Sequence, residues 1–115
     1  MTASGALAVG FADAFPLSSG PTLVVPRRHE PDFFALTIEE QVGVLALAND
    51  LRRQLREELS FDGVNLCVNA GIAAGQTIGH AHLHLVPRST GDVADPSGDI
   101  RWVLPEGANY WGGTP

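Results

Sequence analysis

The chain has 115 residues and a formal net charge of −6, and its seven basic residues are all arginine. This length predicts a single domain, and the acidity argues against nucleic-acid binding, because a nucleic-acid backbone requires a broad basic surface. No apolar stretch is long enough without charges to span a membrane, so we expect no membrane partner.

Two features of the sequence predict a cytoplasmic protein. The segment 1–15 is apolar, but it lacks a basic beginning and contains Asp13, so we predict no signal peptide. Cys67 is the single cysteine and stands inside the apolar run 64–68. It has no partner for an internal disulfide, so we expect a buried, unreactive thiol in a reducing compartment.

Short apolar runs bounded by Gly, Pro and Ser predict strands. The segment 13–21 holds two prolines and a Ser-Ser-Gly cluster, which is typical of a loop between the first two strands. A late strand is expected near the C-terminus. The five predicted strands span residues 7–11, 22–25, 64–68, 80–86 and 100–104.

One long helix is predicted between the second and third strands. Thr37 and Glu40 have the spacing of a capping box, in which each side chain accepts a hydrogen bond from the other residue's backbone N–H, so the helix should begin at Ile38. Its apolar positions recur at helical spacing. These positions are Ile38, Val42, Leu45, Ala48, Leu51, Leu55 and Leu59.

One long helix packed against about five short strands predicts an α+β fold with a mostly antiparallel sheet. We expect one domain over residues 1–115, with a core of about residues 7–88 and a C-terminal extension over 89–115.

Three of the four histidines fall within five residues, at His80, His82 and His84. Alternate side chains of a strand share a face, so we expect the three imidazoles on one face and Ala81 and Leu83 turned into the core. A lone histidine is most often structural. Three imidazoles on one face bring no core packing, and they indicate a functional site.

A metal site is one interpretation, because three histidines can hold Zn²⁺ with one coordination position open. Three consecutive positions on one face extend over about 13 Å, however, which is too far to converge on one ion without bending the strand. Asp92 is the first carboxylate after the cluster, and it follows a proline and a glycine. We expect no metal ligands here, and keep a His-cluster metal-binding protein as an alternative.

Covalent catalysis is the favoured interpretation, with His82 as the nucleophile. Imidazole attacks phosphorus well and also leaves well near neutral pH. The preceding loop supports this interpretation. We expect Gly71 and Gly75 to let backbone N–H groups approach an anion, with further donors on the side chains of Asn69, Gln76 and Thr77.

These residues resemble the histidine triad (HIT) family of nucleotide hydrolases and transferases, and they predict a single HIT domain. The similarity rests on the loop residues just named and on the run from His80 to Arg88. Segments 11–13 and 23–29 also fit, so the resemblance spans residues 7–88. The tail 101–111 is similar to a prokaryotic subgroup that is labelled diadenosine-polyphosphate-hydrolase-like.

The resemblance implies a covalent mechanism. His82 would attack the α-phosphorus of a nucleoside 5′-phosphate anhydride, ester or amidate and form a nucleotidyl-histidine intermediate. Water or another acceptor would then release the nucleoside monophosphate. His84 would donate to the phosphate, and His80 would orient and support the nucleophile.

The resemblance also implies how the substrate is held. Asn69 and Thr77 would contact the phosphate or the bridging atom, beside Gly75 and Gln76 of the same loop. The carboxylate of Asp13 would bind the ribose hydroxyls. The base of a purine nucleotide, adenosine by preference, would lie among Phe11, Ala14, Phe15 and Leu23. The family forms homodimers and requires no cofactor, although Mg²⁺ could arrive with a polyphosphate substrate.

The chain departs from the family pattern at one supporting position. Many members carry a fourth histidine where this chain has Pro21, and proline cannot relay a proton. His29 either takes part of that role or is an ordinary surface residue. Pro21 also keeps open a low-turnover nucleotide-binding sensor or scaffold. Trp102, Tyr110 and Trp111 either shape the leaving-group side or pack the tail.

Overall fold

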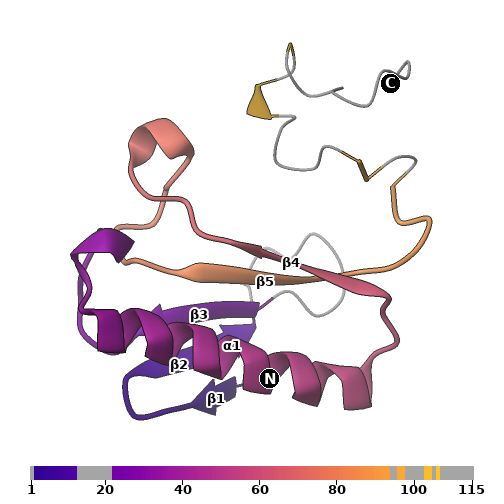
Figure 1. Cartoon of the computed structure of the whole chain (residues 1–115), viewed down its shortest axis with the longest axis horizontal. Coiled ribbons are helices and arrows are strands. Elements are labelled where there is room, and N and C mark those ends of the chain that lie inside the picture. The colour runs from indigo at the N-terminus through magenta and orange to yellow at the C-terminus, as the bar shows by residue number, and fades with distance from the viewer. Residues whose placement is uncertain (1, 13–21, 94–95, 98–102, 105, 107–115) are drawn as a thin grey trace.

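The structure is a computed structural model that describes residues 2–12, 22–93, 96–97, 103–104 and 106. Within these residues, five strands form one antiparallel sheet in the order β1-β2-β3-β5-β4, so β1 and β4 are its edges (Figure 1). The strands are β1 (Thr2–Ser4), β2 (Ala8–Ala12), β3 (Thr22–Pro26), β4 (Gly63–Cys67) and β5 (Leu83–Arg88). The predicted α+β fold is confirmed.

The predicted strands 7–11, 22–25 and 64–68 are present with ends shifted by one residue at most. β1 was not predicted, because three residues are too few to show an alternating pattern. The expected late strand lies mostly outside the described residues. Its described part, residues 103–104, is not in a strand. The fifth strand of the sheet is therefore β1.

The helix α1 (Ile38–Glu58) begins where the capping box predicts. The Thr37 hydroxyl accepts from the Glu40 N–H at 3.1 Å, and the Glu40 carboxylate accepts from the Thr37 N–H at 2.9 Å. α1 lies across one face of the sheet, over β2 and β3 (Figure 1). Among the described residues, no helix combines the length and the hydropathy that a membrane-spanning segment needs.

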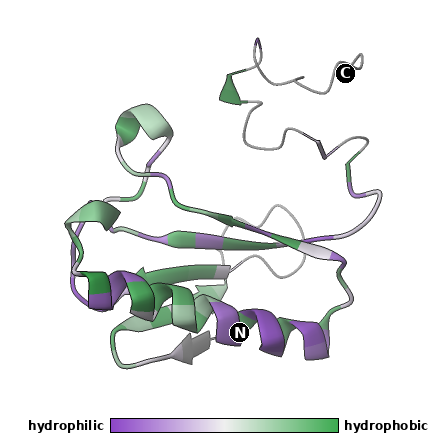
Figure 2. Ribbon diagram, viewed as in Figure 1, coloured by the Kyte–Doolittle hydropathy of each residue, from purple (hydrophilic) through white to green (hydrophobic). Residues whose placement is uncertain are grey.

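The predicted apolar face of α1 is wrong in its first half. Ile38, Val42 and Leu45 are 72%, 57% and 50% exposed. In Figure 2, the first turns of α1 carry many hydrophobic residues, whereas its last turns are mostly hydrophilic. The core face of the helix carries Val44, Leu47, Ala48, Leu51 and Leu55. Helical spacing alone could not choose between two overlapping apolar stripes.

The core lies between α1 and the sheet, where Val24, Leu83 and Leu85 meet the buried face of the helix. Gly10 of β2 permits the close approach, because a Cβ at this position would be 2.5 Å from the Leu51 Cδ1. The edge strand β4 is only half buried, and Leu66 is 54% exposed. It is therefore not the buried strand that its apolar sequence predicts.

Candidate active site

The three clustered histidines lie where loop 68–82 joins β5. The strand begins at Leu83, so His80 and His82 precede it and only His84 is a strand residue. The observed strand therefore begins three residues later than the predicted strand 80–86, and it ends two residues later. The two residues that flank His82 behave as expected, because Ala81 and Leu83 are both 2% exposed.

His82 is held by one of its two ring nitrogens. Its Nδ1 lies 2.8 Å from the His80 carbonyl oxygen. A carbonyl can only accept a hydrogen bond, so the proton of the neutral ring is on Nδ1 and the Nε2 lone pair is unprotonated. Within the described residues, no hydrogen-bond partner meets Nε2. The ring is thus fixed at one nitrogen and available at the other.

His82 is less exposed than we expected. Only 4% of the residue is accessible, although it lies outside the hydrophobic core cluster. Its ring packs edge-on against the ring of His84, with centroids 4.7 Å apart and planes at 73°. The His84 ring is thus one of the groups that cover His82, and the residue is largely removed from bulk water.

His80 does not join a row of three imidazoles on one face. Its Nε2 donates to the Pro26 carbonyl oxygen at 2.9 Å, and its ring packs edge-on against His29 with centroids 5.2 Å apart. His80 supports His82 through its backbone carbonyl. The expectation of three parallel side chains is wrong, because the chain leaves extended geometry before the strand begins. His29 is exposed, but it lies beside the cluster.

The segment after β3 holds the backbone around His80. The Ala81 N–H donates to the Glu30 carbonyl at 2.7 Å. Arg28 donates to both carboxylate oxygens of Glu40, with contacts at 3.0 and 3.1 Å, and so ties this segment to the first turn of α1. The Arg28 hydrogen bonds, together with the Thr37 N–H, lower the pKa of the Glu40 carboxyl to about 2.

The loop itself is closed by one side chain. Gln76 accepts from the Gly71 N–H at 2.8 Å and donates to the carbonyls of Pro31 and Ile78 at 2.7 and 2.9 Å. Both amide hydrogens are used, so Gln76 positions the loop in this structure and does not present a donor to an anion. This function of the side chain could not be read from the sequence, because Pro31 is 45 residues away.

Gly71 and Gly75 differ from our expectation. Both have φ of +93°, a backbone conformation that favours glycine. The Gly71 N–H is bonded to Gln76, and the Gly75 N–H donates to the Ile72 carbonyl at 2.9 Å. Neither is available to an anion. Within the described residues, the N–H groups of Thr77 and Ile78 have no partner, and Thr77 is exposed.

Cys67 is half buried at the end of the edge strand, where it pairs with His84 across the ladder. Its Sγ lies 3.4 Å from the Asn69 Oδ1. The predicted buried thiol is therefore wrong, because β4 has a neighbour on one side only. Asn69 itself lies beside the turn at Gly75.

The predicted nucleoside contacts are partly outside the described residues. Asp13, Ala14, Phe15 and Pro21 all lie there, as do Trp102, Tyr110 and Trp111. Of the described positions, Phe11 on β2 is directly opposite Leu23 on β3. Phe11 is 37% exposed and Leu23 is buried.

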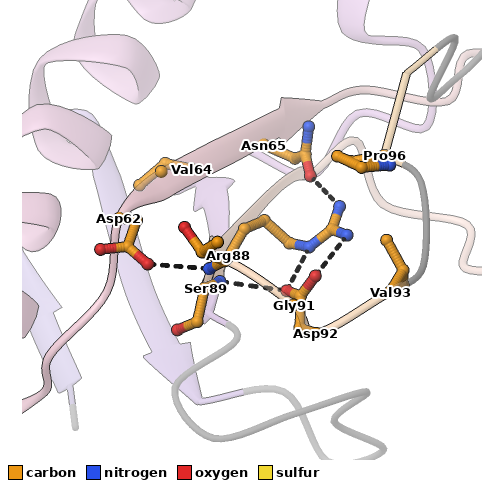
Figure 3. Close-up of a pocket in the computed structure, with 11 residues that line it drawn as sticks. Asp62, Val64, Asn65, Arg88, Ser89, Gly91, Asp92, Val93 and Pro96 are labelled. Carbon is orange, nitrogen blue, oxygen red and sulfur yellow. Dashed lines mark hydrogen bonds and ion pairs between the residues drawn. The ribbon is translucent and has the colours of Figure 1, made fainter.

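A separate hollow of about 600 Å³ lies at the other end of β5, around Arg88 (Figure 3). Arg88 donates to both oxygens of Asp92 at 2.8 and 3.0 Å and to Asn65 at 2.6 Å. These contacts, with the Ser89 N–H, lower the pKa of Asp92 to about 2. No predicted site residue lines this hollow, in which Arg88 and Asp92 bind each other and Asp62 accepts from the Thr90 N–H.

The described residues contain no group of three or more His, Cys, Asp or Glu side chains placed to hold a metal ion. The divergence of His80 from the other two rings explains why the histidine cluster does not form such a group.

One capped helix covers an antiparallel sheet, with His80 and His82 just before the fourth strand in sheet order and His84 within it. These features define the histidine triad class of folds. Residues 4–91 match the HIT domain. The chain therefore belongs to the HIT domain family.

Relatives of known sequence agree with this assignment. An uncharacterised HIT-like protein of Mycoplasma genitalium is 41% identical over 81 residues, which are 70% of this chain and 57% of that protein. A bis(5′-nucleosyl)-tetraphosphatase of Schizosaccharomyces pombe is 28% identical over 89 residues, 77% of this chain and 49% of the enzyme. The chain thus spans little more than half the length of the curated relatives that it matches.

A solved structure supports the fold. The zinc-bound histidine triad family protein of Mycobacterium smegmatis is 37% identical, with a TM-score of 0.74 over 81% of this chain and 68% of that chain. The family includes dinucleoside polyphosphate hydrolases, as the tetraphosphatase shows, and also proteins without a defined activity.

Proposed function

We propose that the chain is a nucleotide hydrolase or transferase that cleaves nucleoside 5′-phosphate anhydrides, esters or amidates through a nucleotidyl-histidine on His82. The observation that carries this proposal is the state of the His82 ring. Its Nδ1 donates to the His80 carbonyl, and its Nε2 has no hydrogen-bond partner among the described residues, in a residue that is only 4% exposed. A neutral imidazole held in this way presents a lone pair to an electrophile.

The reaction has two halves. In the first, the Nε2 lone pair of His82 forms a bond to the α-phosphorus, and the bond from phosphorus to the leaving group breaks. The leaving group departs with the electron pair and takes up a proton. In the second half, water adds to phosphorus and loses a proton, the P–N bond breaks, and the nucleoside monophosphate is released. His82 regains its lone pair.

The neighbours of His82 support both halves. Nδ1–H remains bonded to the His80 carbonyl while the ring becomes positively charged, so the carbonyl dipole stabilises the intermediate. His84, with its ring beside that of His82, would donate to the phosphate oxygens. Thr77 and Asn69 would contact the phosphate or the bridging atom, at the loop that Gln76 closes. Asp13 and Ala14 would bind the nucleoside, for which we propose adenosine.

Two exposed apolar surfaces support a homodimer. β4 is an edge strand of the described sheet, and Leu66 stands exposed on it. The outer stripe of α1 formed by Ile38, Val42 and Leu45 is also exposed. Unprotected edges and contiguous apolar surface are typical of protein interfaces.

The test is to trap the covalent adduct. Wild type, His82→Ala and Asp92→Asn are incubated with phosphorus-labelled adenosine 5′-phosphoramidate and quenched without acid. Wild type and Asp92→Asn should carry label and release AMP, and His82→Ala should do neither. Labelling of His82→Ala would contradict the proposal.

Two further outcomes identify the alternatives. Binding of the nucleotide without AMP release would indicate a sensor or scaffold. Activity lost after chelation and restored by Zn²⁺ would indicate a metal-dependent histidine cluster, since the phosphoramidate carries no polyphosphate that needs Mg²⁺.

A further inference from the structure

The segment 26–31, which begins at the last residue of β3, offers backbone carbonyls to the histidine cluster. Its Pro26 carbonyl accepts from the His80 ring at 2.9 Å, and its Glu30 carbonyl accepts from the Ala81 N–H at 2.7 Å. These residues are far apart in the sequence, so the tertiary fold sets both contacts. The position of the histidine backbone therefore depends on how segment 26–31 is held.

A single peptide group links this segment to the proposed nucleophile. Its N–H is that of Ala81, and it donates to the Glu30 carbonyl. Its C=O is that of His80, and it accepts from the His82 Nδ1 at 2.8 Å. Hydrogen bonds in series polarise one another, so the bond to Glu30 makes the His80 oxygen a stronger acceptor. The Glu30 carbonyl thus influences the His82 ring through one peptide group.

The side chain of Arg28 holds the turn that contains Glu30. Its guanidinium donates to both Glu40 oxygens at 3.0 and 3.1 Å, to the Ala35 carbonyl at 3.4 Å, and to one Glu30 oxygen at 3.5 Å. The other Glu30 oxygen accepts from the Asp32 N–H at 3.1 Å. Arg28 therefore ties α1 to the turn whose backbone carbonyl meets the histidine cluster.

The ion pair between Arg28 and Glu40 differs from an ordinary surface pair. The Glu40 side chain is 10% exposed, and its carboxylate also accepts from the Thr37 N–H at 2.9 Å, so one partner is fixed in place. A two-point contact with a fixed carboxylate sets the direction of the guanidinium as well as its distance. A lysine at position 28 would supply the charge without this geometry.

We propose that Arg28 is a positioning residue for the reaction at His82. It acts through the Glu30 carbonyl and the peptide group that this carbonyl meets. The inference rests on the proposed function. When the His82 ring becomes positively charged, its Nδ1–H becomes a charge-assisted donor, so a well-placed His80 oxygen stabilises the charged ring more than the neutral one. The contribution of Arg28 should therefore appear in kcat and not in KM.

The first measurement separates kcat from KM by AMP release from adenosine 5′-phosphoramidate. Arg28→Gln should lower kcat roughly tenfold and leave KM within about twofold, because the ring is misplaced while the proposed substrate contacts remain. Arg28→Lys should stay at least about threefold below wild type, because its ammonium lacks the guanidinium fork.

Arg88→Gln is the matched control for these variants. Arg88 also binds a carboxylate by two contacts, to Asp92, but at the other end of β5. This variant should keep kcat within about threefold of wild type. Denaturant unfolding of both glutamine variants checks that they are folded under the assay conditions.

A double-mutant cycle tests the route through α1. Glu40→Gln keeps an acceptor for the Thr37 N–H in the capping box and removes the charge that Arg28 binds, so it should lower kcat several-fold. The double variant Arg28→Gln/Glu40→Gln should have about the kcat of Arg28→Gln alone, because both changes break one ion pair. Losses that multiply would contradict this route.

A second measurement follows the His82 ring in the free protein by proton NMR. Its Nδ1–H should give a downfield resonance in slow exchange with water, because the hydrogen bond is 2.8 Å long in a residue that is 4% exposed. The resonance is assigned by its loss in His82→Ala. In Arg28→Gln it should move upfield and exchange faster, whereas Arg88→Gln should leave it in place.

Failure of this inference differs from failure of the proposed function. A wild-type kcat in Arg28→Gln, or a His82 resonance that this variant leaves unchanged, would overturn the role of Arg28 alone. No AMP release from wild type would overturn the proposed function, and this inference with it.

Discussion

At one end of the β4–β5 hairpin, the His82 ring is bonded through Nδ1 to the His80 carbonyl and packs edge-on against the ring of His84. At the other end, Arg88 binds Asp92 and Asn65, and the Thr90 N–H donates to Asp62 at 2.7 Å. The Arg88 end satisfies its charges internally, whereas the histidine end leaves the Nε2 of His82 without a described partner. Groups that bind one another stabilise a turn, and a group held at one atom only is available for chemistry.

The largest difference between the two ends should appear in turnover. His82→Ala should lower kcat by roughly 10⁴-fold or more, as expected when a covalent nucleophile is removed. Asp92→Asn at the Arg88 end should leave kcat within about threefold. Single-turnover AMP release measures both. If His82→Ala kept more than a tenth of the wild-type rate, the nucleophile would have to be another residue.

A smaller difference in kcat/KM should distinguish the side-chain amides of Gln76 and Asn65, which lie at opposite ends of the hairpin. Gln76→Ala frees the loop from Gly71 and Pro31, and the resulting misplacement should lower kcat/KM by about 10²-fold. Asn65→Ala removes an amide that binds Arg88 and serves as the matched control, with turnover nearly unchanged. Equal losses in both variants would mean that the hairpin responds as one unit.

The smallest effect concerns stability in acid. The pKa of Asp92 is lowered to about 2 by Arg88 and the Ser89 N–H, so its ionised form is stabilised in the folded state. This contribution is fully present above the unfolded pKa near 4 and is lost as the pH falls toward 2. Denaturant unfolding of Asp92→Asn from pH 6 to pH 2 should therefore show a flatter decline than wild type.

The control for this prediction is Asp50→Asn. Asp50 forms an ion pair with Arg53 on α1 at 2.8 Å, and both side chains are more than half exposed. Such pairs add little to stability, so this variant should decline with pH as wild type does. A decline in Asp92→Asn as steep as in wild type would show that the Arg88 pair contributes nothing measurable.

Local signals in the sequence predicted much of the fold. The Thr37 and Glu40 capping box places the beginning of α1 correctly because its two hydrogen bonds span only three residues. Three strands were predicted with ends shifted by one residue at most, because each is a short apolar run between turn residues. The beginning of β5 was missed, since its alternating pattern continues backward through His80 although the backbone does not.

Long-range contacts explain the errors in the site. The sequence identified His80, His82 and His84 as a cluster, but it did not show that the His80 ring turns toward Pro26, 54 residues earlier. It identified Gln76, but it did not show that the side-chain amide of Gln76 donates to the Pro31 carbonyl. Whether an apolar residue of α1 faces the core depends on where the sheet lies, so Ile38 and Val42 were misplaced.

Residue order alone determined the chemical groups available and their spacing, because cap motifs, turns and the histidine repeat act over a few residues. The tertiary structure alone decided which atom of each group is free. The Gln76 amide donates to the carbonyl of Pro31, 45 residues away, and the His80 ring bonds to the carbonyl of Pro26, 54 residues away. What remains unbound is set by the fold, since a partner that is remote in sequence becomes near only when the sheet forms.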